Sequence, residues 1–212
     1  MRSSWQHPAS ILSHRLGWAA GLIALVVALV WWGLPALQKS FAPRAVPVLD
    51  SDVCLVAPPT PYDPASGQPL HAARAVPADA RCPVCGMFPA RSPDWAVQVI
   101  FANGYVHFFD SPVSLFMYLN DVSRYSPGLS AHDIVARYVT DVSSKSWIDA
   151  GSAYFVHGSS AKGPMRAGNL PAFATRGAAQ QFAAQRGGEV RSFGAIDPAL
   201  VRQLGGQSSH RH

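Results

Sequence analysis

The hydrophobic pattern divides the chain into one long apolar segment and a region of short alternating elements. Residues 16–37 (LGWAAGLIALVVALVWWGLPAL) carry no charged side chain, and Arg15 and Lys39 flank them. About 20 apolar residues can cross a bilayer as a helix, and tryptophans near one end suit the membrane surface. The segment therefore predicts an N-terminal transmembrane anchor. A cleaved signal peptide is the alternative, and both readings export the rest of the chain.

Proline and alanine dominate the next stretch, residues 38–80. Proline fixes φ and removes a hydrogen-bond donor, so this stretch predicts an extended linker between anchor and domain. The sequence leaves open whether the linker also packs along the domain.

Short strand and helix patterns follow the linker. Residues 95–101 (WAVQVIF) and 105–109 predict two strands, and Asn-Gly at 103–104 predicts the hairpin between them. Asp110 or Ser111 then caps a helix that begins at a proline.

A second set of elements resembles the first. Strands are expected at 134–140, 153–156, 170–173 and 190–193, and a helix capped by Thr175 at 177–185. The segments HFFDSPVSLFMYL and PAFATRGAAQQFA align by eye as strand end, capping residue and amphipathic helix. We therefore predict an α+β fold of two related strand-strand-helix modules forming a small domain, preceded by one N-terminal transmembrane helix.

These elements define five regions of the chain. They are a cytoplasmic N-terminus (1–15), a transmembrane anchor or uncleaved signal (16–37), a linker (38–80), a folded domain (81–198) and a disordered tail (199–212). A single N-terminal span before a long domain usually leaves the N-terminus inside. We expect an inner-membrane protein with its C-terminal domain in the periplasm.

Charge and motifs exclude two broad classes. The net charge is +5, but lysine and arginine form no run of three, so we expect no nucleic-acid binding. The chain has neither Gly-x-Ser-x-Gly nor a phosphate-binding loop, and no acid–base pair stands out. We predict a binding protein and not an enzyme.

The candidate chemistry lies in Cys82-Pro-Val-Cys85-Gly-Met87. Two thiols and a thioether are soft ligands that favour copper(I) over hard cations, and Gly86 lets the backbone turn so that they converge. Three alternatives remain open for the two cysteines: half of a zinc site, a redox pair, and a structural disulfide. Cys54 makes the cysteine count odd, so at least one thiol is unpaired.

Two residues of the loop after the 153–156 strand are further metal candidates. Met165 lies in a polar loop, where a methionine has little reason to be core, and His157 opens that loop as a ligand or as a group that orients one. Met117, on the apolar helix face, and His107, among aromatic residues, are expected in the core.

Several motifs in order resemble the NosL family, the nitrous-oxide reductase accessory proteins. They are CPVCGM (82–87), WAVQVIFANGYVHFFDSP (95–112), YVTDVSSKSWIDAGSAYFVHGS (138–159), GPM (163–165), LPAFAT (170–175) and GGEV (187–190). The resemblance implies an exported copper(I) carrier, often lipid-anchored, with an α+β domain of two related modules. It implies a metal site at Cys85, Met87 and Met165. Cys82 and His157 are further candidates from the residues themselves, and the resemblance leaves the role of Cys82 open.

The resemblance also implies partners and shows departures. The partners are a membrane ABC-type copper-centre assembly system with its periplasmic subunit, and nitrous oxide reductase indirectly. No lipobox cysteine ends the apolar segment, Arg166 stands where glycine is expected, and Cys82 is an additional thiol. We predict a copper(I) chaperone that supports maturation of the copper centres of nitrous oxide reductase. The alternatives are a membrane-anchored thiol-disulfide oxidoreductase using Cys82 and Cys85, and a purely structural component of the same membrane complex.

Overall fold

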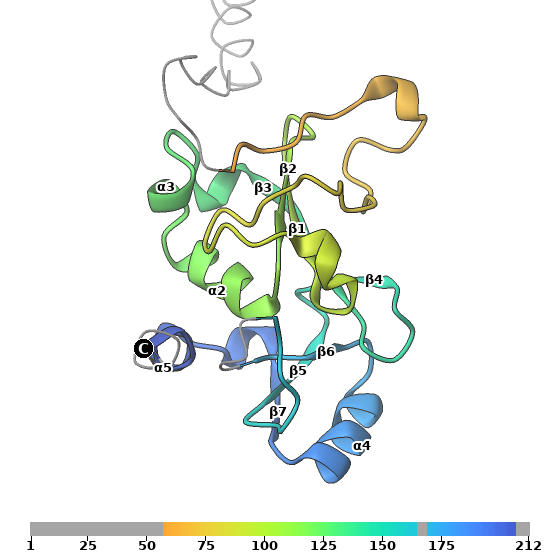
Figure 1. Ribbon diagram of the computed structural model, residues 1–212, viewed down its shortest axis with the longest axis vertical. Coiled ribbons are helices and arrows are strands. Elements are labelled where there is room, and N and C mark those ends of the chain that lie inside the picture. The colour runs from red at the N-terminus through yellow and green to blue at the C-terminus, as the bar shows by residue number, and fades with distance from the viewer. Residues whose placement is uncertain (1–56, 165–168, 207–212) are drawn as a thin grey trace, which may run out of the picture. The chain divides into compact units, whose positions relative to one another are not determined.

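A computed structural model describes residues 57–164 and 169–206. These residues belong to one compact unit that spans residues 46–212 (Figure 1). The elements in chain order are β1 (Val97–Phe101), β2 (Val106–Phe109), α2 (Pro112–Asn120), α3 (Val122–Tyr125), β3 (Ile134–Thr140), β4 (Trp147–Asp149), β5 (Tyr154–His157), β6 (Ala172–Phe173), α4 (Arg176–Arg186), β7 (Glu189–Ser192) and α5 (Pro198–Gly206).

The strands form two antiparallel sheets with matching topology. The first sheet has the order β2-β1-β3-β4, and the second has the order β6-β5-β7. In each, the first strand along the chain is central, the second strand pairs on one side, and a helix precedes the strand that pairs on the other side. This confirms the α+β class, and the shared order supports the two related modules.

The first sheet is covered on both faces. Val97, Val99 and Phe101 of β1 point into the main core, which includes residues of α2. Ile100 lies on the opposite face, in a smaller cluster that Val76 of the preceding segment helps to close. All five residues of β1 are consequently buried.

Residues 57–80 pack along the domain, which settles for this stretch what the sequence left open. Thr60 pairs with Val106 through two backbone hydrogen bonds, of 2.8 and 3.0 Å. The buried Gln98 side chain accepts from the Arg74 amide and donates to the Arg74 carbonyl, at 3.0 and 3.1 Å. The proline-rich stretch thus satisfies a buried amide that β1 presents on this face.

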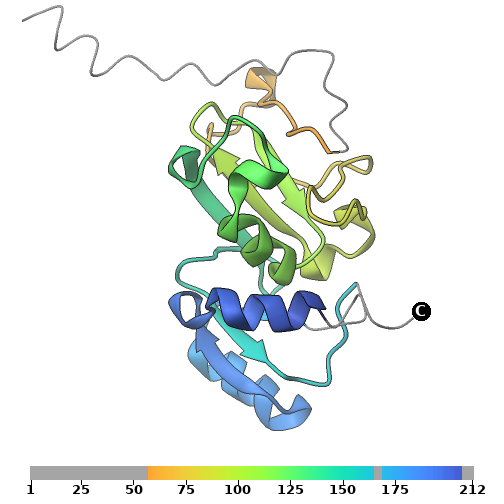
Figure 2. The ribbon, with the colours of Figure 1, turned by 90° about the vertical axis from the view of Figure 1, so that its left-hand side faces the viewer.

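The second sheet and the C-terminal helix share the main core. Phe155 of β5 contacts the ring of Phe116 on α2, with 5.4 Å between centroids. Val201 and Leu204 of α5 are buried in the same cluster, and α5 packs against α2 (Figure 2). Residues 199–206 of the expected disordered tail therefore belong to a helix, because the apolar positions of α5 through Leu204 have a surface to bury against.

The proposed span, residues 16–37, lies outside the described residues. Among residues 57–164 and 169–206, no helix is long and apolar enough to cross a membrane. The longest there, α4, has 11 residues, about half of what a bilayer requires.

Candidate metal centre

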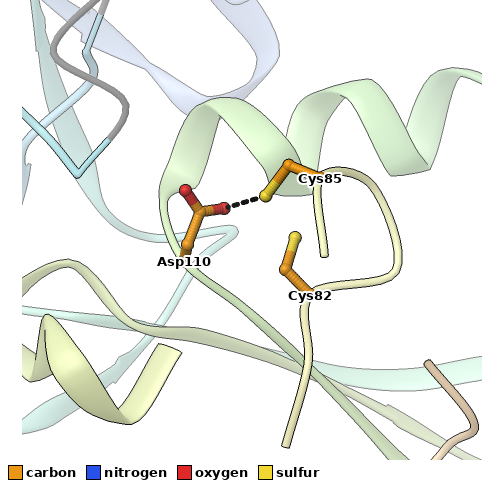
Figure 3. A group of neighbouring side chains, drawn as sticks. All are labelled: Cys82, Cys85 and Asp110. Atoms are coloured by element: carbon orange, nitrogen blue, oxygen red, sulfur yellow. Dashed lines mark hydrogen bonds between the residues drawn. The ribbon is translucent and has the colours of Figure 1, made fainter. Parts of the chain in front are cut away.

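A tight loop brings the two cysteines of the Cys-x-x-Cys motif together. The Cys82 amide donates to the Met87 carbonyl at 2.9 Å, and the Gly86 amide donates to the Cys82 carbonyl at 2.8 Å. Gly86 has φ +71°, a left-handed conformation that glycine adopts without steric cost. Figure 3 shows the two sulfur atoms pointing to the same space.

Asp110 joins the cysteines from the junction of β2 and α2. Ser111 is the N-cap of α2, since its side chain accepts from the Ser114 amide, so the Asp110 carboxylate is free for other contacts. One carboxylate oxygen of Asp110 and the sulfurs of Cys82 and Cys85 all lie within 4.8 Å of one another. Within the described ranges, this is the group of histidine, cysteine and acidic side chains that could hold a metal ion.

The Asp110 carboxylate is only half satisfied. Its Oδ1 accepts from the Cys85 thiol at 3.3 Å and from the Ser114 hydroxyl at 2.6 Å. Its Oδ2 is buried without a hydrogen-bond partner. Burying a carboxylate oxygen without a hydrogen-bond partner costs folding free energy, so a carboxylate with a purely structural role is seldom placed in this way.

The two thiols ionise differently. Burial alone would raise the pKa of Cys82, but the hydrogen bonds with the Cys85 side chain and with the backbone of Asp110 and Cys85 together outweigh it, and the pKa of Cys82 is lowered. The pKa of Cys85 is raised by its hydrogen bond with Cys82, by burial, and by the negative charges of Cys82 and Asp110. The pair therefore loses its first proton readily and holds the second tightly.

Solvent access rises along the loop. Cys82 is fully buried, Cys85 is half-buried, and Met87 is 38% exposed. Both cysteines are free thiols. A soft metal held here would have a closed side at Cys82 and an open side toward Met87.

Of the remaining predicted ligands, His157 lies among the described residues. Met165 and Cys54 lie outside the described residues. His157 is on β5 of the second sheet, where its backbone pairs with Glu189, and it is not part of the cysteine–aspartate group. Met117 packs against the main core and His107 is buried, as expected.

Asp110 is the site residue that the sequence did not indicate. It was interpreted as a cap or surface group, because aspartate often precedes a helix. Its neighbours were the available signal: in HFFDSP a carboxylate directly follows a strand end of three aromatic residues. Such a position is buried unless the strand lies at a surface, and a buried carboxylate requires a partner.

The site can bind a soft metal ion. Metal–sulfur bonds of about 2.3 Å, as in zinc sites, span sulfur atoms up to about 4.6 Å apart, so little movement is needed to chelate an ion between the cysteines. An α+β domain with two convergent free thiols and a buried carboxylate offers a group of side chains that could hold a metal ion.

Comparisons with known proteins name the family. The family model NosL matches residues 73–201, and the chain belongs to this family. The copper-binding lipoprotein NosL of Stutzerimonas stutzeri is 33% identical over 135 residues, which cover 61% of this chain and 70% of the relative. The crystal structure of the copper chaperone NosL from Shewanella denitrificans has a TM-score of 0.52 and 26% identity, and covers 62% of this chain and 99% of that one.

The relatives bear on two further predictions. They are named as a copper-binding protein and a copper chaperone, not as enzymes, which confirms the prediction of a binding protein without a reaction of its own. The Stutzerimonas relative is named a lipoprotein and not a single-span membrane protein. With the absence of a spanning helix among the described residues, this overturns the predicted inner-membrane, single-span localisation.

Proposed function

We propose that this protein binds copper(I) and delivers it for maturation of the copper centres of nitrous oxide reductase. The observation that carries the proposal is the pair of free, convergent thiols of Cys82 and Cys85 in a closed loop. Membership of the NosL family, with relatives named as copper-binding and copper chaperone proteins, supports the choice of metal.

The proposed ligands are sulfur atoms. Thiolate and thioether sulfurs prefer copper(I), whereas a carboxylate oxygen prefers harder ions. We therefore assign Cys82, Cys85 and Met87 as ligands, with Met165 and His157 as the candidates from the second module. Asp110 is assigned to orienting the Cys85 thiol through the 3.3 Å hydrogen bond before copper(I) binds, rather than to binding copper(I) itself.

The exposure of the loop suits a carrier. A buried cysteine keeps one bond to the metal while the exposed methionine on the opposite side is replaced by a ligand from an acceptor. Copper(I) is then never released to solvent, since donor and acceptor ligands both touch it during transfer. The proposed acceptor is the membrane ABC-type assembly system with its periplasmic subunit, as the family resemblance implies.

A thiol-disulfide oxidoreductase fits the geometry less well. Such enzymes expose a nucleophilic cysteine of lowered pKa, commonly at a helix N-terminus. Here the more accessible cysteine, Cys85, has a raised pKa, and the cysteine of lowered pKa is fully buried. Neither cysteine starts a helix.

Anaerobic titration of the full-length chain with copper(I) against a chromogenic chelator tests the proposal, with X-ray absorption of the loaded protein. We expect one tightly held copper in a sulfur-rich shell. Cys85→Ala, Met87→Ala and Met165→Ala should each weaken it. Met117→Leu is the matched thioether control and His132→Ala the control for His157→Ala, and both controls should bind normally.

Delivery requires a separate measurement. Loaded chain is mixed with copper-free nitrous oxide reductase and its assembly system, and the copper content and colour of the enzyme are followed. A chain that binds copper normally and restores no copper centre would refute delivery while leaving copper binding intact. Normal delivery by the Met87→Ala, Met165→Ala double variant would refute the proposed ligand set.

A further inference from the structure

Two arginines stack on the aromatic residue that follows Met87. Met87 is followed by Phe88, and a short 3-10 turn, η2 (Pro89–Arg91), comes next. The Arg81 guanidinium carbon lies 4.2 Å from the Phe88 ring centroid, and that of Arg91 lies 4.4 Å from it. Both arginines are exposed.

These contacts fix the two guanidinium groups beside the metal loop. Arg81 also donates from Nη1 to the Gly86 carbonyl at 3.2 Å, so it is tied to the residue between Cys85 and Met87. A guanidinium that stacks on an aromatic ring keeps its N–H edge available for hydrogen bonds, and that edge matches a carboxylate in bidentate geometry.

Neither arginine has an acidic partner among the residues that the structure describes. The ion pairs of the described residues join Lys145 to Asp94 and Arg191 to Glu189, and leave Arg81 and Arg91 unpaired. Asp79 lines the same groove as Arg81 but forms no ion pair with it. Two guanidinium groups without a bound carboxylate therefore lie at the open side of the metal loop.

We propose that Arg81 and Arg91, stacked on Phe88, form a docking rim for a copper acceptor whose own site is surrounded by acidic side chains. The inference rests on the proposed function and adds the chemistry of the partner. A metal exchange needs the acceptor ligand to reach Met87, the exposed end of the loop, and the rim lies directly beside it. Complementary charge there orients the acceptor and raises the rate of productive encounter.

A protein acceptor suits this rim better than an anionic lipid surface. The rim consists of two positions around a metal loop, whereas electrostatic membrane binding draws on clusters of about four or more basic residues. Guanidinium groups with fixed orientation favour the specific geometry of a few carboxylates.

Copper transfer to synthetic peptides tests the rim. The full-length chain is loaded with copper(I) and mixed with one of two peptides, which carry the same Cys-x-x-Cys site flanked by glutamate in one and by glutamine in the other. The copper content of the peptide is measured after rapid separation at timed intervals. At low salt we expect transfer to the acidic peptide to be about tenfold faster, with the difference shrinking as salt screens the charges.

Variants assign the effect to the two arginines. Arg81→Gln with Arg91→Gln should abolish the preference for the acidic peptide while copper affinity stays unchanged. Arg124→Gln with Arg176→Gln is the matched control, since these arginines also stack on aromatic rings, of Tyr125 and Tyr154, and it should retain the preference. Loss of the preference in the control pair as well would show a general charge effect and overturn the rim.

The outcomes separate the two proposals. If the wild-type chain takes up no copper, the proposed function fails and the docking rim fails with it. If copper is bound and transferred at rates that ignore the charge of the peptide, only the rim fails. A third outcome is that the chain shows no preference between the peptides but binds vesicles of anionic lipid, and that this binding is lost when Arg81 and Arg91 are replaced. That result would overturn the rim and assign the two arginines to a membrane surface.

Discussion

Asp110 shows how one residue acquires a role from its surroundings. Its position after a buried strand leaves the carboxylate with two donors on Oδ1 and none on Oδ2, beside two thiols. Its negative charge acts against ionisation of both thiols: it helps to raise the pKa of Cys85, and at Cys82 it opposes the hydrogen bonds that lower the pKa. A cation between the sulfurs would relieve that repulsion.

Replacing Asp110 with asparagine should make the metal-free thiols more reactive. Asparagine keeps the shape and the acceptor for Ser114 but removes the charge, so the pKa of Cys85 should fall. The rate of alkylation by iodoacetamide as a function of pH should shift to lower pH. Asp94→Asn, at the surface, is the control, and an unshifted profile for Asp110→Asn would rule out the electrostatic role.

His107 makes the domain sensitive to acid. Burial lowers the pKa of His107 from 6.5 to about 4, and its Nε2 lies 2.9 Å from the Ser126 hydroxyl, which also accepts from Tyr118. The unfolded chain therefore binds a proton at higher pH than the folded chain. The folded state is therefore most stable with respect to His107 above pH 6.5, where the imidazole is neutral in both states. Stability is lost as the pH falls toward 4, because the unfolded chain takes up the proton first.

Over this pH range, His107 should lower the free energy of unfolding by about 3 kcal/mol, at about 1.36 kcal/mol for each unit of pKa difference between the folded and unfolded states. Urea unfolding of the metal-free protein at a series of pH values measures it. His107→Gln should flatten the dependence in this range, whereas His132→Gln, at the surface, should leave it. An equally steep dependence in His107→Gln would place the acid sensitivity elsewhere.

At the scale of the elements, the loop of Cys82 to Met87 depends on one backbone conformation. Gly86 has φ +71°, and a Cβ added there would meet no atom within 4 Å. A side chain at position 86 is therefore unfavourable only because of the left-handed backbone conformation, and not because of a steric clash with neighbouring atoms. Gly177 offers the opposite case, in the first turn of α4 with free space around it.

Gly86→Ala should lower the free energy of unfolding by about 1–2 kcal/mol and weaken copper binding, since the sulfurs lose their convergence. Gly177→Ala should raise stability by up to about 1 kcal/mol and leave copper binding unchanged. Urea unfolding and the chelator competition measure both quantities. Copper affinity that survives Gly86→Ala would show that the turn is not required for the site.

For the whole molecule, the two sheets should unfold together. Phe155 of the second sheet is fully buried against Phe116 and Phe193, within a core that also holds Val97 and Val99 of the first sheet. The modules are similar in topology but share one hydrophobic core.

Phe155→Ala should therefore cost about 3–5 kcal/mol and act on both sheets, because the cavity opens in the shared core. Hydrogen exchange followed by mass spectrometry should show β1 and β5 losing protection to the same extent. Val135→Ala, at a position 48% exposed on β3, is the control and should change little. Loss of protection confined to β5 would mean that the modules are independent.

Local patterns predicted most of the elements. The strand at Ile134–Thr140 and the capping of α4 by Thr175 agree with the sequence interpretation, because alternation and side-chain caps are properties of adjacent residues. β4, α3 and α5 were not predicted. Trp147–Asp149 is too short to show a period, and α5 depends on packing against α2.

The sequence by itself determined the α+β class, the family motifs and the soft character of the Cys82–Met87 loop, since each depends on residues near one another in the chain. Only the tertiary structure brought Asp110 to the cysteines, laid residues 57–80 over the first sheet, and placed Arg81 and Arg91 about Phe88. The physical reason is that burial and unpartnered charge arise from contacts between distant segments. A single sequence records such contacts only indirectly, as an acidic residue among aromatics or a strand apolar on both faces.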